Sequence, residues 1–289
     1  MRYKLIGMDK TYQDTYAWGV KALQDAGIAE AELDARLLLE HVCGTDRNTL
    51  YAHGDRIVET TQGELYASLI GRRAERVPLQ YILGEQEFMG LSFLVNESVL
   101  IPRQDTECLV EEAMISVMDG DRVLDLCTGS GCILLSIMCY KNDIEGVGTD
   151  ISKAALEVAR RNAQTLGKPA LFIESDLFGQ VPSEPFDVIV SNPPYIPSRV
   201  IDTLQAEVKD HEPRGALDGG EDGLVFYRKI IADAPQHLKR GGRIFLEIGF
   251  DQGADVSRLL TDAGFTDVRI VKDFAGLDRV ATAHYIGTE

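Results

Sequence analysis

The stretch with the clearest chemical potential is Ser191-Asn192-Pro193-Pro194-Tyr195, which directly follows the apolar run Phe186–Val190. This run is short and rich in β-branched residues, so we expect a buried strand. Two consecutive prolines stop a strand because each lacks an N–H and has a fixed φ. A stiff loop carrying an amide and an aromatic ring is therefore predicted at the carboxyl end of the strand, where open α/β sheets bind ligands. From these residues alone, an ordinary Asn-Pro turn is an equal alternative.

A second candidate is the glycine turn Asp125-Leu126-Cys127-Thr128-Gly129-Ser130-Gly131, between an expected strand and the following helix. Glycine lets the backbone approach a ligand, and a helix N-terminus offers free N–H groups. Asp150 stands 19 residues past Gly131, at the end of the next strand, where a carboxylate binds ribose hydroxyls. The alternative for Asp150 is a helix-starting carboxylate. A nicotinamide site would have a third glycine where Leu134 stands, so the turn favours S-adenosylmethionine.

Leu177 and the loop Asn192–Tyr195 complete the predicted chemistry. Leu177 follows the third expected strand, at the position where a side chain would contact the adenine of the cofactor. The alternative is an ordinary turn, because Ser175-Asp176 is also typical of turns. A substrate NH₂ group can donate one hydrogen to the amide oxygen of Asn192 and the other to the Pro193 carbonyl, while Tyr195 stacks on the planar group. Together these features predict N-methylation of a planar nitrogen by positioning. They do not distinguish adenine, guanine and glutamine.

The elements that position these residues alternate between strand and helix from residue 121 onward, which predicts a parallel sheet covered on both faces. The last two strands are separated by too short a loop for a crossover, so the final strand is expected to be antiparallel. This is the α/β fold of class I methyltransferases, a Rossmann-like seven-stranded sheet. Strands are expected at Arg122–Leu126, Gly146–Thr149, Ala170–Ile173, Phe186–Val190, Arg243–Ile248, Val268–Val271 and Val280–Ile286.

Upstream of the sheet, helical spacing over residues 11–77 predicts a small helical domain at 1–78. Thr61 and Glu64 form an expected capping box, and Arg72, Arg73 and Arg76 are interpreted as a solvated last turn, with a partner-binding patch as the alternative. Short β-like runs at 80–84 and 91–95 predict a hairpin linker over 79–97. The catalytic domain is then expected at 98–289.

Composition narrows the class of partner. The net charge of −17 disfavours unaided binding to nucleic acid, whose affinity depends on Lys and Arg. Five scattered cysteines without a CxxC pair predict a reducing, cytoplasmic environment and no metal site. No apolar run approaches the roughly 20 residues that span a bilayer, and the first ten residues lack a secretory core. We therefore expect no membrane contact.

With these motifs, the sequence resembles the PrmC/HemK family, which methylates the glutamine of the Gly-Gly-Gln motif in class I peptide chain release factors. The resemblance covers nearly the whole chain and is specific as a combination of segments. These segments are Leu33–Leu39, Pro78–Gly84, Phe88, Leu100–Arg103, Thr106-Glu107, Asp125–Gly131, Asn192–Tyr195, Glu212-Pro213-Arg214, Ala216-Leu217, Gly219–Leu224, Glu247-Ile248-Gly249, Lys272–Gly276 and Asp278-Arg279-Val280.

The resemblance implies that Cys127–Gly131, Asp150, Leu177 and Asn192 line the cofactor and that Asn192–Tyr195 hold the glutamine. It also implies a release factor as protein partner. The chain departs from the family at Cys127, where glycine is usual, at Leu177, where an aromatic residue is common, and at Gln104-Asp105, where Pro-Glu is usual. Two rival functions remain at this stage: a nucleic-acid N-methyltransferase, and a non-catalytic module that binds the cofactor and docks on the translation machinery.

Overall fold

The structure is a computed structural model that describes residues 10–287. The N-terminal stretch Met1–Asp9, for which no secretory segment is expected, lies outside the described residues. Contacts divide the chain into two units. The helical unit runs through Gly84 and includes Gln205–His211, while the sheet unit comprises Glu85–Leu204 and the residues from Glu212 onward. None of the helices in residues 10–287 is long and apolar enough to cross a membrane.

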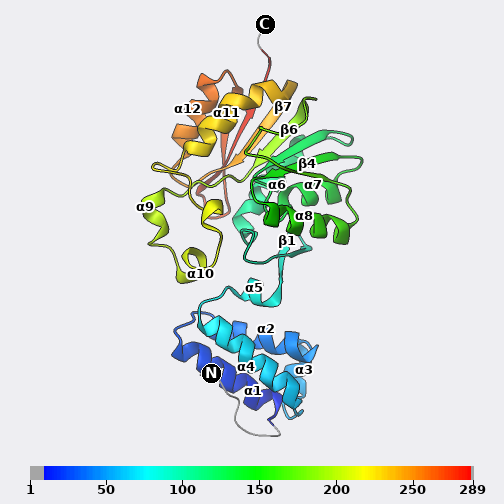
Figure 1. Cartoon of the computed structure of the whole chain (residues 1–289), viewed down its shortest axis with the longest axis vertical. Coiled ribbons are helices and arrows are strands. Elements are labelled where there is room, and N and C mark those ends of the chain that lie inside the picture. The colour runs from blue at the N-terminus through cyan, green and yellow to red at the C-terminus, as the bar shows by residue number, and fades with distance from the viewer. Residues whose placement is uncertain (1–9, 288–289) are drawn as a thin grey trace. The chain divides into compact units, whose positions relative to one another are not determined.

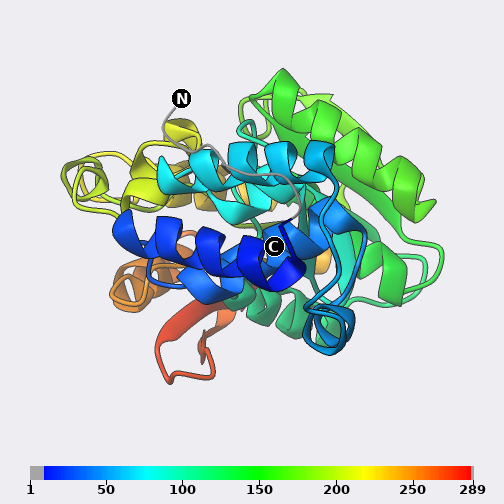
Figure 2. The same cartoon turned by 90° about the horizontal axis from the view of Figure 1, so that it is seen from below.

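The helical unit is built from short amphipathic helices around one core. Three of them lie side by side, from blue to cyan in Figure 2, and they bury Leu23, Leu38, Tyr66 and Ile70 completely. The hydroxyl of Tyr66 donates to the carbonyl of Ala35 at 3.0 Å. The helices of this unit are α1 (Tyr12–Asp25), α2 (Ala31–Cys43), α3 (Arg47–Ala52), α4 (Thr60–Ala74), α5 (Leu79–Leu83) and α10 (Ala206–Lys209).

Two local expectations for this unit are wrong. The capping box of α4 joins Glu59 and Gln62, two residues before the expected pair, with the same three-residue spacing. The run 80–84 is helix α5 rather than a strand, because Pro78 opens a helical turn that Gly84 closes with φ 82°. Five residues with few polar positions carry no periodicity, so the sequence pattern does not separate a short helix from a strand.

The interpretation of Arg73 as a solvated residue is also wrong. Its Nε donates to the carboxylate of Asp34 at 2.7 Å, and its Nη1 lies 3.2 Å from Glu207 of α10. Arg76 meets the same Glu207 carboxylate at 3.1 Å. Arg73 and Asp34 are both buried, so this is an internal ion-pair cluster. It fastens the 205–211 segment to α4, although that segment is remote in the sequence.

The sheet unit contains a seven-stranded sheet in the order β5-β4-β3-β6-β7-β9-β8. Parallel pairing joins the first five of these strands, and β9 is antiparallel to both β7 and β8. The expected fold is therefore confirmed. The strands are β3 (Arg122–Leu126), β4 (Glu145–Asp150), β5 (Leu171–Glu174), β6 (Phe186–Ser191), β7 (Leu238–Glu247), β8 (Thr266–Lys272) and β9 (Asp278–His284).

Helices cover both faces of this sheet (Figure 1). One layer contains α6 (Gln104–Ser116), α7 (Cys132–Tyr140) and α8 (Lys153–Leu166); the other contains α11 (Val225–His237) and α12 (Gly253–Asp262). The apolar, β-branched strands are buried between them, as a parallel sheet requires. Short helical turns α9 (Ser198–Ile201) and η1 (Arg214–Ala216) lie in the long connection after β6.

A two-stranded hairpin precedes α6 and packs on the first layer. Its strands are β1 (Glu85–Phe88) and β2 (Leu91–Leu94), and the buried rings of Phe88 and Phe93 meet edge to face. Asn162 of α8 accepts from the N–H of Leu94 at 2.7 Å and donates to its carbonyl at 3.1 Å. The hairpin is thus a fixed part of the sheet unit.

Candidate active site

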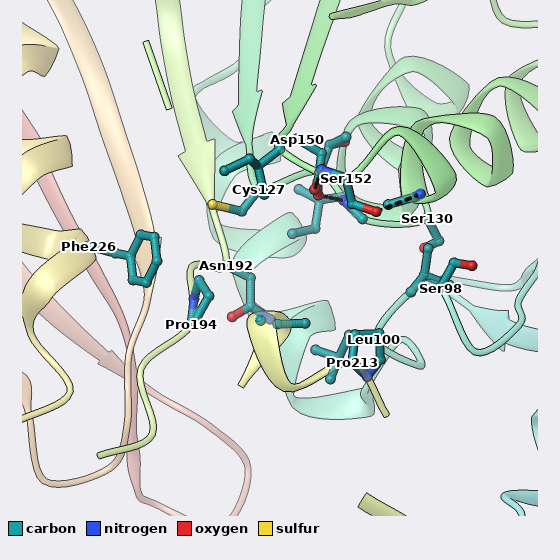
Figure 3. Close-up of a pocket in the computed structure, with 18 of the residues that line it drawn as sticks. Ser98, Leu100, Cys127, Ser130, Asp150, Ser152, Asn192, Pro194, Pro213 and Phe226 are labelled. Atoms are coloured by element: carbon teal, nitrogen blue, oxygen red, sulfur yellow. Dashed lines mark hydrogen bonds between the residues drawn. The ribbon is translucent and has the colours of Figure 1, made fainter. Parts of the chain in front are cut away.

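A pocket of about 460 Å³ opens at the carboxyl ends of β3, β4 and β6. Cys127, Asp150 and Asn192 each follow or end one of these strands, and their side chains face the same space in Figure 3. The parallel strands bring together residues that are widely separated in the sequence. Of the predicted site residues, the pocket is lined by Cys127, Thr128, Gly129, Ser130, Asp150, Leu177, Asn192 and Pro194.

The turn after β3 has an unusual backbone. Cys127, Gly129 and Gly131 all have positive φ, at 58°, 55° and 80°. A non-glycine residue in this region costs roughly 1–2 kcal/mol, so the departure at Cys127 stores local strain. A Cβ added at Gly129 would meet no atom within 4 Å, whereas one at Gly131 would lie 3.1 Å from Leu135 Cδ1. Gly129 therefore borders open pocket space, and Gly131 permits close helix packing instead of lining the pocket.

Asp150 joins this turn to the next helix. Its Oδ2 accepts from the N–H of Gly129 at 3.0 Å, and its Oδ1 accepts from the N–H of Ser152 at 2.9 Å. Burial raises the pKa of Asp150, while these backbone hydrogen bonds oppose the rise. Each carboxylate oxygen has a second lone pair. Asp150 can therefore hold the turn and the start of the next helix, which was the alternative role expected for it, and still accept hydrogen bonds from a pair of ribose hydroxyls.

Leu177 forms an apolar part of the wall. It has a positive φ of 50°, and its carbonyl accepts from the Ser175 hydroxyl at 2.8 Å, so the backbone of this turn is held from within. The Leu177 side chain is buried with Phe178 in the layer beneath α11. A flat heterocycle would meet aliphatic contact at this position rather than a stacked ring.

Asn192 directly follows β6 and has a defined amide orientation. Its Nδ2 donates to Thr106 Oγ1 of α6 at 3.3 Å. Among the residues that the structure describes, none donates a hydrogen bond to Asn192 Oδ1. Because this side chain lines the pocket, the amide presents a free acceptor to a substrate. The prolines that follow hold the backbone of the loop stiff.

Pro193 and Tyr195 lie behind this lining. The phenol of Tyr195 is half-buried and donates to Glu247 Oε1 at 3.4 Å, a long hydrogen bond. Burial, followed by the nearby charge of Glu247, raises the pKa of Tyr195. Tyr195 is therefore a neutral ring at physiological pH. In this conformation it packs against the apolar layer of α11 and α12.

A glycine-rich segment clamps the Asn192–Tyr195 loop from outside. A Cβ at Gly219 would lie 2.7 Å from Tyr195 Cα, and one at Gly223 would lie 2.3 Å from the Tyr195 carbonyl oxygen. That carbonyl accepts from Gln252 Nε2 at 3.0 Å. Only glycine permits so close an approach of two backbones. The segment Gly219–Leu224 thus fixes the loop position.

Several pocket residues were not predicted. Arg103 lines the pocket and pairs with the buried Glu212, which also accepts from the N–H of Ile101. Glu107 is turned away and accepts from the N–H of Met89 at 2.6 Å, so it supports the hairpin. The remaining lining includes Leu100, from the segment Leu100–Arg103, and Ser98, Phe226 and Lys229, which come from segments with no recognisable motif. Only the fold brings them to the strand ends.

The pocket suits an S-adenosylmethionine molecule. Gly129 supplies open backbone space, Asp150 supplies acceptors, and Leu177 supplies an apolar wall. Within residues 10–287, no group of three or more His, Cys, Asp or Glu could hold a metal ion. A seven-stranded sheet with an antiparallel last strand and this turn defines a class I S-adenosylmethionine-dependent methyltransferase.

Comparison with known proteins specifies the class further. Residues 14–84 match the model of the PrmC N-terminal domain, and residues 104–209 match the methyltransferase small domain. The chain is 42% identical to the release factor glutamine methyltransferase of Geobacter sulfurreducens, over 93% of this chain and 95% of that protein. It is also 42% identical to the release factor glutamine methyltransferase of Agrobacterium fabrum, over 96% and 98% of the two chains.

A methyltransferase from Pyrococcus furiosus shares the fold, with a TM-score of 0.55 and 19% identity, over 75% of this chain and all of that one. The chain belongs to the release factor glutamine methyltransferase family, as its motifs indicate.

Proposed function

We propose that this protein transfers a methyl group from S-adenosylmethionine to the side-chain nitrogen of a glutamine, the one in the Gly-Gly-Gln motif of class I peptide chain release factors. The observation that carries this proposal is the amide of Asn192. Its Nδ2 is engaged by Thr106, so its Oδ1 is available to a substrate N–H. An acceptor at this place selects a substrate nitrogen that carries hydrogen.

The cofactor residues act by binding and orientation. We assign the ribose hydroxyls to Asp150, the adenine to the wall at Leu177, and the amino-acid part to the turn Cys127–Gly131. When bound, S-adenosylmethionine supplies an electrophilic methyl group. The strained turn is already in place, as are the N–H groups of Gly129 and Ser152 that donate to the Asp150 carboxylate. Such a preformed site spends little binding energy on ordering the protein.

The loop after β6 orients the substrate. A glutamine NH₂ group would donate one hydrogen to Asn192 Oδ1 and the other to the Pro193 carbonyl, and Tyr195 would cover the face of the amide. Both hydrogens are then held, so the nitrogen is directed at one point of the pocket. Positioning of this kind accounts for most of the rate in an in-line displacement. The proton can leave after methyl transfer, so no base is needed before it.

The helical unit is proposed to recognise the protein part of the substrate. Its surface and that of the sheet unit together give the chain a net charge of −17, which favours a basic partner over nucleic acid. We place the reaction in the cytoplasm, where the five free cysteines would stay reduced.

The test is transfer of labelled methyl groups from S-adenosylmethionine to a purified class I release factor, to the same factor with alanine in place of the Gly-Gly-Gln glutamine, and to RNA and DNA. We expect label on the unaltered release factor alone. Label on nucleic acid alone, or equal label on the alanine-substituted factor, would refute the proposal.

A further inference from the structure

Three large apolar side chains are exposed at the edge of the sheet that carries the pocket. Phe250 is 62% exposed, Phe274 is 94% exposed and Leu277 is 45% exposed. Phe250 lies just beyond the carboxyl end of β7, and the other two lie in the turn from β8 to β9. Single exposed apolar residues are common on protein surfaces, whereas a group of them on one edge marks an interaction site. We call these three residues the apolar rim.

The two turns that carry the apolar rim are neighbours. Strand β9 runs antiparallel to β7, with Val280 opposite Glu247, so β9 begins where β7 ends. Beyond this pair, the N–H of Ile248 donates to the carbonyl of Arg279 at 2.8 Å. The β8–β9 turn, drawn in red in Figure 2, therefore projects from the same edge of the sheet at which the parallel strands end.

Hydrogen bonds within the β8–β9 turn hold Phe274 in a fixed position. Asp273 Oδ1 accepts from the N–H groups of Ala275 and Leu277, both at 2.9 Å. Its Oδ2 accepts from Arg279 Nη2 at 3.0 Å, and its N–H donates to the Leu277 carbonyl at 2.8 Å. Turns are usually built from small or polar residues, so the turn itself does not require an outward phenylalanine. A side chain presented on such a fixed backbone loses little freedom on binding.

The turn that carries Phe250 is joined to the loop Asn192–Tyr195, which we call the substrate loop. Gln252 closes this turn, because its Oε1 accepts from the N–H of Gly249 at 2.9 Å. Its Nε2 donates to the Tyr195 carbonyl at 3.0 Å. The apolar rim is thus continuous with the part of the pocket assigned to the glutamine, and a protein that inserts a glutamine there lies against the rim.

The charged groups beside the apolar rim favour a basic partner. Asp251 is exposed in the first of the two turns, on a chain whose net charge is −17. The cations of the second turn are already paired: Lys272 lies 3.2 Å from Asp278, and Arg279 lies 3.0 Å from Asp273. A complementary surface therefore combines apolar side chains with Lys or Arg.

We propose that the apolar rim is a docking surface for the release factor, which it contacts beside the glutamine that enters the pocket. This inference rests on the proposed function, because the occupant of the surface is taken to be the substrate of the adjoining loop. Phe274 inserts between apolar side chains of the factor, and basic residues of the factor meet Asp251. Aromatic side chains that become buried dominate the energy of such interfaces. The rim adds affinity for the whole protein and leaves the chemistry at Asn192 unchanged.

The experiment compares Phe274→Ser with Ile115→Ser, with a purified class I release factor as substrate. We expect Phe274→Ser to raise KM about 10–30-fold and to leave kcat within about twofold, because the same contact exists before and during methyl transfer. Phe274→Trp, which keeps an aromatic ring, should stay within about threefold of the unaltered enzyme. Because Phe274 is almost fully exposed, neither replacement should change the midpoint of thermal unfolding.

Ile115→Ser is the matched control. Ile115 is 76% exposed near the end of α6, whose opposite end lines the pocket at Thr106. This control should change neither KM nor kcat, because Ile115 lies away from the apolar rim. Equal KM values for Phe274→Ser and Ile115→Ser would overturn the proposal.

Binding is measured separately, by fluorescence anisotropy of a labelled release factor without S-adenosylmethionine. The dissociation constant should rise about 10–30-fold in Phe274→Ser and about 3–10-fold in Phe250→Ser. Methylation by the unaltered enzyme, with an unchanged dissociation constant in Phe274→Ser, would refute the docking surface alone. Binding that weakens in Phe274→Ser, although the unaltered enzyme methylates no release factor, would refute the proposed function alone. Loss of a dimer in Phe274→Ser by sedimentation, with unchanged binding of the factor, would assign the rim to a second copy of this chain and overturn the proposal.

Discussion

Gly223→Ala tests whether the glycine-rich clamp holds the substrate loop in place. The added Cβ would lie 2.3 Å from the Tyr195 carbonyl oxygen and 2.7 Å from Gln252 Nε2. Ordinary contacts of this kind are 3.4–4 Å, so backbone must move by about 1 Å. A displacement of about 1 Å at a positioning site costs about 100-fold in rate. We therefore expect kcat/KM for release factor methylation to fall about 100-fold.

The matched control is Gly167→Ala at the end of α8. Gly167 has φ 66°, close to the 76° of Gly223, but an added Cβ would meet nothing within 4 Å. Both alanines carry the same backbone cost of roughly 1–2 kcal/mol. Gly223→Ala also carries the cost of the clash, so it should lower the free energy of unfolding more than Gly167→Ala does. Only Gly223→Ala moves Tyr195.

The assay measures initial rates of methyl transfer, with calorimetry for S-adenosylmethionine and thermal unfolding for both variants. Cofactor affinity should be nearly unchanged in Gly223→Ala, because the clamp contacts the substrate loop rather than the Cys127–Gly131 turn. If the two alanine variants had the same kcat/KM, the clamp would not position the loop.

Three further changes probe other parts of the molecule. Arg73→Met leaves the buried Asp34 carboxylate without its cation and leaves Glu207 with Arg76 alone, so it should lower the free energy of unfolding by about 3–5 kcal/mol in urea titrations. The exposed Arg72→Met should change the free energy of unfolding by less than about 0.5 kcal/mol, and equal losses would show that the cluster is not stabilising. Asp150→Ala should weaken the binding of S-adenosylmethionine about 10–100-fold, as measured by calorimetry. Asp150→Asn should weaken it less, because one acceptor oxygen remains. Unchanged binding in Asp150→Ala would show that Asp150 is not part of the cofactor site. Cys127→Gly relieves the strain of the positive φ of 58° and should raise the free energy of unfolding by about 0.5–1 kcal/mol. A lower midpoint of thermal unfolding in this variant would contradict the expectation.

The sheet and the pocket could be predicted because their signals are local. Apolar β-branched runs end at a glycine turn, an aspartate and a Pro-Pro pair, and parallel strands bring such ends together. The strand bounds agree with expectation to within a few residues, except that β7 begins at Leu238 rather than at Arg243. Here the strand continues through Gly241 and Gly242, which sequence patterns treat as a turn.

The buried polar contacts could not be predicted. In the sequence, Arg73 is an ordinary residue for a helix end, and only the return of residues 205–211 supplies Glu207 as its partner. Thr106 accepts from Asn192 and Glu247 accepts from Tyr195, and both acceptors lie on other elements than the substrate loop, so these contacts depend on tertiary packing. The roles assigned to Asn192–Tyr195 and Cys127–Gly131 stay predictions, which the substitutions and methylation assays test.

The most direct test of the central claim is mass spectrometry of a class I release factor after reaction with this enzyme and S-adenosylmethionine. We expect one added methyl group on the glutamine of the Gly-Gly-Gln motif, and we expect it to be absent when the Asn192→Ala variant replaces the unaltered enzyme. A methyl group on any other residue, or an undiminished yield with Asn192→Ala, would contradict it.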